Sequence, residues 1–440
     1  MNTAEARLAR RGGEFLVNSV SGGGQQDPQI VALPDGGFFL LWQRGGNVVA
    51  RRFGAASQPL GPEFQVNQTA PGTPQRSRVA AGSDGSVLVV WCAFMPPDQT
   101  GIVGRRYDST GAAEGPQFTI LDRGSYGGGA VATIGAHDFV VAWTDDVALR
   151  ARATTVGPTG TGGIFQVAQD GTQYDLAIGP YAAGAFHVVW YGEPLATMQG
   201  RSFSGERPTG DVFPISRVTS STHQGPAICA HDAGDFVVAW VTTEDPGGNG
   251  TTSPVRYRIY DAASSPVTLP LAVTPEEINQ DLGTPVQIYP AVACGPGSEF
   301  TVVWLDVTVY PEVSIRGRGF SDNTSTLDFR IGLVGESGGI SVARLKDGDE
   351  VVTWNECTTS NECDVLAQRF TSASVSESAG DCNADGKVTI SELVTIVNII
   401  LAGDSPAITR RCLMADTDLD YKVEIYELLS AVNESLREAQ

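Results

Sequence analysis

The feature that most constrains this sequence is a short apolar phrase that ends in tryptophan and returns along the whole chain. Its clearest copies are Asp138–Trp143 and Asp235–Trp240, which share the letters D-F-V-V-A-W. All seven tryptophans end a copy of this phrase: Trp42, Trp91, Trp143, Trp190, Trp240, Trp304 and Trp354. Successive copies lie about fifty residues apart, a period typical of propellers and solenoids.

Each repeat holds four short stretches of strand-forming residues, separated by turns rich in glycine and aspartate. In the second repeat the expected strands are Ser77–Ala81, Val87–Trp91, Ile102–Tyr107 and Gln117–Ile120. Four antiparallel strands per repeat are typical of one blade of a β-propeller. We name these strands A to D in chain order and expect the tryptophan that ends strand B to pack between blades.

The last repeat lacks a fourth strand, and the beginning of the chain offers a matching one. Glu14–Asn18 differs from Glu63–Asn67, the fourth strand of the first blade, at one position. Pairing the first strand with the last blade would close the ring and remove two exposed sheet edges. The sequence therefore predicts a mainly β protein, with an N-terminal tail at 1–13 and a seven-bladed β-propeller at 14–370.

Strand C repeats an arginine that lies two residues before an aromatic residue. The pairs are Arg51/Phe53, Arg105/Tyr107, Arg201/Phe203, Arg258/Tyr260 and Arg318/Phe320, and Arg152 is expected at this place in the third blade. Residues two apart on a strand share a face. A ring of arginines suggests an anion site, but we favour a structural interpretation, with the guanidinium groups stacked on rings or paired with acids of the next blade.

The charge balance argues against nucleic acid as a ligand. The chain has 29 basic and 50 acidic residues, a formal net charge of −21, whereas nucleic-acid sites need basic surfaces. No run of eighteen apolar residues occurs, so no membrane span is expected. Residues 1–13 lack the apolar segment of a signal peptide, so the chain is either cytosolic or begins after a removed leader.

The cysteines favour the second alternative, an extracellular or cell-surface protein. Cys357 and Cys363 flank a short loop and are expected to form a disulfide, and Cys382 and Cys412 are candidates for another. The remaining cysteines lie in or beside strands and are expected to be buried apolar residues: Cys92, Cys229 and Cys294.

The B–C and D–A loops vary in length and emerge on the same face of the ring, where binding residues commonly lie. The acids of this face are Asp98, Asp145, Asp146, Glu193, Glu244, Asp245, Glu276, Glu277, Asp281, Asp306 and Glu312, and its tyrosines are Tyr126, Tyr174, Tyr191 and Tyr310. Such residues suit a glycoside hydrolase or a glycan-binding surface, or they are simply solvated. Because no catalytic motif accompanies them, we favour a non-catalytic protein and leave enzyme activity open.

A calcium-binding loop follows a serine-rich linker at 371–380. Asp381–Glu392 matches the loop D-x-[DN]-x-[DN]-G-x5-E at every fixed position. The expected oxygen ligands are the side chains of Asp381, Asn383, Asp385 and Glu392 and the backbone carbonyl of Lys387. Ca²⁺ is therefore the expected cofactor.

The loop recurs 35 residues later. The expected ligands of this second loop are Asp416, Asp418, Asp420, Lys422 and Glu427. Tyr421 stands where the loop needs glycine for its sharp turn, so we expect weaker calcium binding there. Apolar residues at helical spacing follow both loops.

These two loop–helix halves resemble a dockerin, a calcium-dependent adaptor module that plugs into cohesin domains. The resemblance covers residues 380–437 and implies a small all-α domain at 381–440. In dockerins, loop positions ten and eleven recognise the partner, and here they hold Ile390-Ser391 and Ile425-Tyr426. The propeller repeats are similar to bacterial exported proteins with "DGGFVVVW" phrases.

Three functions fit these features. The first is an exported, non-catalytic binding, adhesion or scaffold protein, with a glycan or protein on the loop face and a cohesin-like partner on the tail. The second is a carbohydrate-active enzyme, a glycoside hydrolase or lyase, that carries a dockerin. The third is a structural surface or filament subunit that assembles through its tail.

Overall fold

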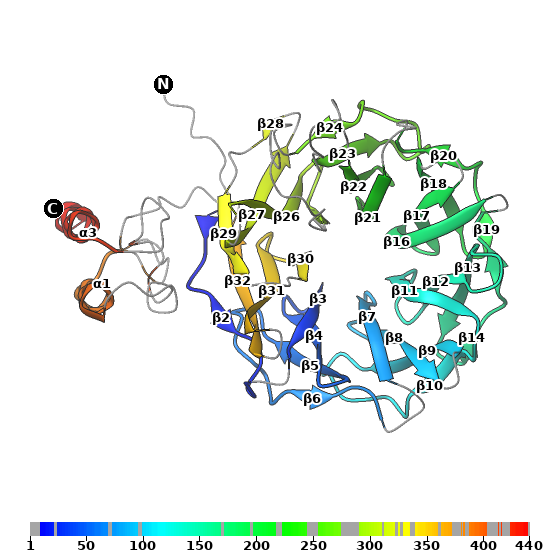
Figure 1. Ribbon diagram of the computed structural model, residues 1–440, viewed down its shortest axis with the longest axis horizontal. Helices are drawn as coiled ribbons and strands as arrows, with labels where there is room; N and C mark the ends of the chain where they lie inside the picture. The colour runs from blue at the N-terminus through cyan, green and yellow to red at the C-terminus, as the bar shows by residue number, and fades with distance from the viewer. Residues whose placement is uncertain are drawn as a thin grey trace.

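The described strands form seven antiparallel sheets arranged as a ring, with strand A of each sheet innermost (Figure 1). The predicted seven-bladed β-propeller is thus confirmed. The computed structural model describes residues 9–21, 24–68, 73–95, 99–168, 171–193, 197–216, 222–243, 254–273, 290–309, 312–321, 324–325, 329–334, 339–359, 362–371, 380, 382, 387–402, 412, 415 and 423–438.

The first three blades follow one another along the chain. Blade 1 contains β3 (Gln26–Ala32), β4 (Phe38–Arg44), β5 (Asn47–Phe53) and β6 (Phe64–Gln65). Blade 2 contains β7 (Thr73–Ala81), β8 (Val87–Met95), β9 (Gln99–Tyr107) and β10 (Phe118–Leu121). Blade 3 contains β11 (Ser125–Thr133), β12 (Phe139–Asp145), β13 (Ala151–Gly157), β14 (Gly160–Thr161) and β15 (Phe165–Gln166).

Blades 4 to 6 repeat the pattern. Blade 4 contains β16 (Thr172–Ala182), β17 (Ala185–Glu193), β18 (Thr197–Ser204), β19 (Arg207–Pro208) and β20 (Phe213–Pro214). Blade 5 contains β21 (Thr222–Ala230), β22 (Phe236–Thr243), β23 (Val255–Tyr260) and β24 (Leu271–Ala272). Blade 6 contains β25 (Ala291–Cys294), β26 (Phe300–Val309), β27 (Glu312–Ser321), β28 (Thr324–Ser325) and β29 (Phe329–Val334).

Blade 7 joins the two ends of the propeller. It contains β30 (Ile340–Arg344), β31 (Glu350–Thr359) and β32 (Glu362–Thr371), with β1 (Ala9–Arg10) and β2 (Phe15–Leu16) from the chain start both paired to β32. Phe15 lies opposite Ala367, and the Val17 backbone N–H donates to the Val365 carbonyl at 2.9 Å. The predicted closure of the ring by Glu14–Asn18 is confirmed, because β2 lies in this segment. The short strand β1 precedes the expected start of the propeller at residue 14 and was not predicted.

Each tryptophan packs against the preceding blade, as its place at the end of strand B predicts. Trp42 lies in a buried cluster with Val351 and Val365 of blade 7, and Trp91 lies in one with Phe39 of blade 1. The remaining tryptophans follow the same rule, and every indole is nearly or fully buried. Burial of large aromatic surface therefore holds neighbouring blades together.

The strand C arginines also join neighbouring blades. Four of them each donate one hydrogen bond to strand D of the preceding blade and one to their own C–D turn, while their guanidinium groups lie over the aromatic ring two residues on: Arg51, Arg105, Arg201 and Arg258. The structural interpretation is correct for these four, although carbonyl oxygens rather than acids are the partners. Arg152 was misplaced by two residues: it lies opposite Trp143, and Thr154 holds the arginine position.

Two cysteines expected as isolated buried residues form a disulfide instead. Cys229 of β21 and Cys294 of β25 are bonded to each other and link the inner strands of blades 5 and 6. The expected bond between Cys357 and Cys363 is present. Among the described residues, Cys92 is the free cysteine, and it is buried as predicted.

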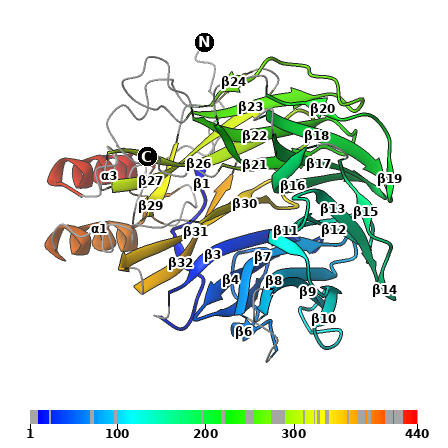
Figure 2. The ribbon, with the colours of Figure 1, turned by 45° about the vertical axis from the view of Figure 1, so that its right-hand side comes forward.

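Two helices follow the propeller and lie outside its ring (Figures 1 and 2). They are α1 (Ile390–Ala402) and α3 (Ile425–Glu438). They share a small buried cluster that includes Ile396 and Ala431, and the disulfide between Cys382 and Cys412, the second predicted pair, lies beside them. Neither described helix is long and apolar enough to cross a membrane.

Candidate functional site

Five of the described inner strands contain a β-bulge near their first residues. The pairing of strand A with strand B shifts between Gln26/Gln29, Gln75/Arg78, Tyr126/Ala130, Tyr174/Ala177 and Gln224/Ala227. A bulge leaves a residue outside the ladder and redirects its side chain. Because strand A begins where strand B ends, the bulges lie toward the face on which the B–C loops emerge.

The backbone is left-handed at four of these bulges. The φ angle is 50° at Asp27, 49° at Arg76, 48° at Asp175 and 57° at Gly225. Glycine adopts this conformation freely, whereas another L-residue loses about 1–2 kcal/mol there. Strain of this kind is concentrated at functional sites. We therefore take the charged bulge residues as the candidate site.

Sequence reasoning missed these residues, although a signal was present. Each lies fifteen residues before the tryptophan of its blade, as the pairs Asp27/Trp42, Arg76/Trp91, Asp175/Trp190 and Gly225/Trp240 show. Gly128, Tyr289 and Gly339 occupy the same position in blades 3, 6 and 7, and the Gly339 backbone is not left-handed. Glycine and aspartate at several copies of one repeat position are compatible with a left-handed conformation.

The first charged pair at the site joins blades 1 and 2. The Arg78 Nη1 atom lies 3.1 Å from the Asp27 Oδ2 atom, and the Gln29 side chain donates to the other oxygen of this carboxylate at 3.2 Å. Arg78 also donates to the Ser77 carbonyl at 2.8 Å. The Asp27 carboxylate is therefore neutralised and held in place.

Asp175 is the second carboxylate of the site. Partial desolvation beside the inner strands raises the pKa of this carboxyl group, although its side chain is still exposed to solvent. The positive charge of Arg76 and the backbone N–H of Gly225, which donates to the carboxylate, oppose this rise in pKa. Arg76 and Asp175 belong to blades 2 and 4, so they interact across the inner side of blade 3.

Arg76 differs from Arg78 and Arg344, the other described arginines of the inner strands. Its side chain is exposed, and within the described part of the chain its guanidinium group makes no hydrogen bond or ion pair. Its charge also acts on the nearby Cys92 thiol, whose pKa is raised by burial. The site thus combines an exposed cation with a carboxyl group that keeps its proton to higher pH than usual.

Part of the predicted loop face is described, and its acids are mostly neutralised. Asp145 lies 3.0 Å from Arg152, and Asp306 forms an ion pair with Arg316. Tyr174 and Tyr191 face each other across β16 and β17, with ring centroids 6.5 Å apart. The other residues predicted for this face, apart from the exposed Asp146, lie outside the described residues or side chains: Asp98, Glu193, Glu244, Asp245, Glu276, Glu277, Asp281, Glu312, Tyr126 and Tyr310.

Two buried titratable groups elsewhere have structural partners. Glu350 accepts hydrogen bonds from Thr301 at 2.8 Å and from Arg344 at 3.1 Å, and burial raises its pKa to about 7. His187 is stacked on Phe236 and bonded to Ser202 at 2.8 Å, and burial lowers its pKa to about 4. Both groups are closed off from solvent, so we do not assign them to the site.

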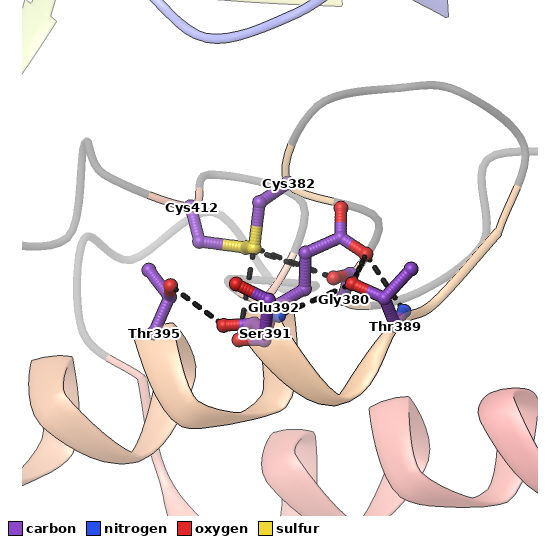
Figure 3. Close-up of a disulfide and its surroundings, with 7 residues drawn as sticks. All are labelled: Gly380, Cys382, Thr389, Ser391, Glu392, Thr395 and Cys412. Atoms are coloured by element: carbon purple, nitrogen blue, oxygen red, sulfur yellow. Dashed lines mark hydrogen bonds between the residues drawn. A yellow bond between two sulfur atoms is a disulfide. The ribbon is translucent and has the colours of Figure 1, made fainter.

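The expected calcium ligands are only partly described. Glu392 and Glu427, the last residues of the two loops, are both buried. Glu392 accepts a hydrogen bond from the backbone N–H of Thr389, three residues earlier, at 2.7 Å (Figure 3). Glu427 accepts the equivalent bond from the backbone N–H of Glu424 at 2.9 Å. Lys387 is exposed, and the other expected ligands lie outside the described residues: Asp381, Asn383, Asp385, Asp416, Asp418, Asp420 and Lys422.

The two buried glutamates fit the role of calcium ligands. A buried carboxylate is unfavourable unless a cation or hydrogen bonds compensate it. Both side chains lie at the start of a helix and accept the same kind of backbone hydrogen bond, as expected for equivalent positions of two related loops. Among the described residues, no group of three acidic, histidine or cysteine side chains comes together.

Comparison with known proteins identifies the fold alone. No family model matches the sequence, and no curated protein matches it. A polysaccharide lyase, an ulvan lyase bound to -[GlcA(1-4)Rha3S]-, has a similar structure, with a TM-score of 0.52 at 9% identity over 80% of this chain and 95% of the lyase. An α-L-arabinanase from Penicillium chrysogenum gives a TM-score of 0.47 at 12% identity, over 82% of this chain and 98% of its own.

Proposed function

We propose that this protein is a carbohydrate-active propeller that binds a polysaccharide at the inner-strand bulges and acts on it there. The observation that carries this proposal is that Arg76 and Asp175, both on left-handed backbone, lie close enough for the guanidinium charge to act on the carboxyl group. Guanidinium groups orient oxygen-rich ligands through several hydrogen bonds. A carboxyl group with a raised pKa is better suited to donate a proton to a leaving oxygen than an ordinary aspartate is.

Two further features support a saccharide ligand. Tyr174 precedes Asp175 directly and carries an aromatic ring beside that of Tyr191, and such rings offer an apolar face with a polar tip. The ulvan lyase, which has a similar structure, is bound to a saccharide. Asp175 is the residue to which we assign proton transfer.

A second candidate is glycan binding without turnover. Three carboxylates of the loop face and inner ring are each neutralised by an arginine: Asp27, Asp145 and Asp306. A hydrolase that uses two carboxylates needs both of them available. This pairing favours a recognition surface, so the two candidates must be separated by measuring binding and turnover on the same preparations.

We also propose that the tail binds Ca²⁺ and attaches the protein to a cohesin-like partner. The supporting feature is a matched pair of exposed apolar rows on the two helices. The rows hold Ile390, Val394, Val397 and Leu401 on α1, and Ile425, Leu429 and Leu436 on α3. Calcium would be held between each loop and the helix that follows it, through Glu392 and Glu427 among the expected ligands that the structure describes. The three disulfides support an extracellular location.

The test compares wild type with Asp175→Asn on a panel of soluble polysaccharides, scoring binding by calorimetry and turnover by new chain ends. Asp146→Asn is the matched control, because Asp146 is an exposed carboxylate of the same face. We expect Asp175→Asn to lower kcat about 100-fold or more and the control to keep wild-type turnover. Binding without turnover by wild type supports the second candidate. Turnover that survives Asp175→Asn refutes the assigned role of Asp175.

A further inference from the structure

Arg76 is an unusual residue to find on the left-handed backbone of an inner strand. Arginine lacks the short side chain by which aspartate tolerates left-handed backbone. Blade 5 holds glycine at the same place, without strain. An arginine that served only packing would have no need of this conformation. The guanidinium group on this strained backbone lies close enough to Asp175 and Cys92 for its charge to act on both.

The neighbouring charges leave the Arg76 guanidinium available for a ligand. Arg78 and Asp27 neutralise each other at 3.1 Å. Asp175 lies near enough to feel the charge of Arg76, yet no ion pair forms between them. By contrast, Arg51, Arg105, Arg201 and Arg258 are all bonded to backbone carbonyls. Arg76 is therefore a cation that a ligand group can reach without breaking an internal bond.

We infer that the polysaccharide of the proposed function is anionic, and that Arg76 binds a carboxylate or sulfate group of the sugar unit that sits beside Asp175. This inference rests on the proposed function and adds the substrate class to it. Guanidinium groups bind carboxylate and sulfate oxygens through two parallel hydrogen bonds. The net charge of −21 would repel a densely charged chain from the rest of the surface. A polysaccharide with widely spaced anionic groups therefore fits best.

The test measures binding of wild type to three probes: polyglucuronate, a sulfated rhamnan and neutral arabinan. We expect wild type to prefer one or both anionic probes, and Arg76→Gln to weaken that binding about 10- to 100-fold while leaving any arabinan binding unchanged. Arg123→Gln, on a D–A loop of the same face with an exposed side chain, is the matched control and should change affinity less than about twofold. The two anionic probes tell carboxylate from sulfate recognition.

A stability measurement separates a ligand role from a structural one. Arg76→Gly should keep or raise the melting temperature, because glycine relieves the left-handed strain, and it should lose anionic binding as Arg76→Gln does. A lower melting temperature for Arg76→Gly, or equal loss of neutral and anionic binding in Arg76→Gln, overturns the inference. Wild type that acts on arabinan alone overturns the inference but leaves the proposed function standing. Wild type that binds no saccharide refutes both.

Discussion

Asn18 is the side chain on which closure of the ring can be tested most directly. It is buried, and its amide group donates to Asp364 at 2.7 Å and accepts from the Val365 N–H at 2.8 Å. These bonds join residues at opposite ends of the propeller. Asn67, its counterpart in blade 1, accepts from the Val48 N–H at 2.9 Å within one blade. Replacing either asparagine by alanine removes the same kind of bond.

The expected magnitude follows from these contacts. Asn18→Ala leaves the Val365 N–H unsatisfied in a buried place, which costs about 1–3 kcal/mol, and loses one donated bond to a carboxylate. Asp364 is half-buried and recovers part of that bond from water. The total is about 2–4 kcal/mol. If all of this free energy stabilises the junction between the two ends of the propeller, its loss makes opening of that junction about 30- to 1,000-fold more frequent.

Native-state hydrogen exchange, read on peptides that cover β2 and β32, measures this opening. We expect Asn18→Ala to accelerate exchange in both strands by that factor. Asn67→Ala should accelerate exchange in β5 and β6 and leave β32 as in wild type. Unchanged exchange at β32 in Asn18→Ala, or equal acceleration there in Asn67→Ala, would show that the first strand does not hold the ring shut.

Three further changes have defined outcomes. Burial raises the pKa of Glu350 to about 7, so folding takes up a proton between about pH 4.5 and 7, and the free energy of unfolding falls by about 3 kcal/mol as the pH rises through this window. Glu350→Gln removes that contribution in urea titrations at both ends of the window. Serine at both Cys229 and Cys294, which lie 65 residues apart, lowers stability in denaturant titrations by about 4 kcal/mol. In calorimetry, Asp381→Ala abolishes the tighter of two calcium-binding events, and Asp416→Ala abolishes the weaker one.

The ring itself could be predicted because its determinants are local and repeated. Every blade needs a large apolar residue at the end of strand B to contact the preceding blade, and this need fixes a tryptophan in each copy. The end strand could be recognised because Glu14–Asn18 performs the same task as Glu63–Asn67. Both segments place an asparagine whose oxygen accepts a backbone N–H of strand C.

The predictions for the cysteines, for Arg152 and for the inner strands were wrong or incomplete because these features depend on strand pairing that the sequence does not show. Cys229 and Cys294 each resemble an ordinary strand residue, and only the ring brings their two inner strands side by side. Arg152 was misassigned because strand C of blade 3 carries no aromatic residue to mark its register, and a shift of two residues keeps the same face. The bulges were missed for a similar reason, since an extra residue in strand A leaves the apolar pattern nearly intact.

The candidate site depends on how a propeller departs from its own repetition. Inner strands converge on a small radius, so residues of blades that are not neighbours can act on each other, as Arg76 and Asp175 do. The same repeat position holds glycine in three blades, a charged residue in three others and tyrosine in blade 6. The strain at those three positions is small beside the free energy that tryptophan burial contributes at every blade junction. A regular ring can therefore hold an irregular inner surface, and that irregularity is where a ligand would be selected.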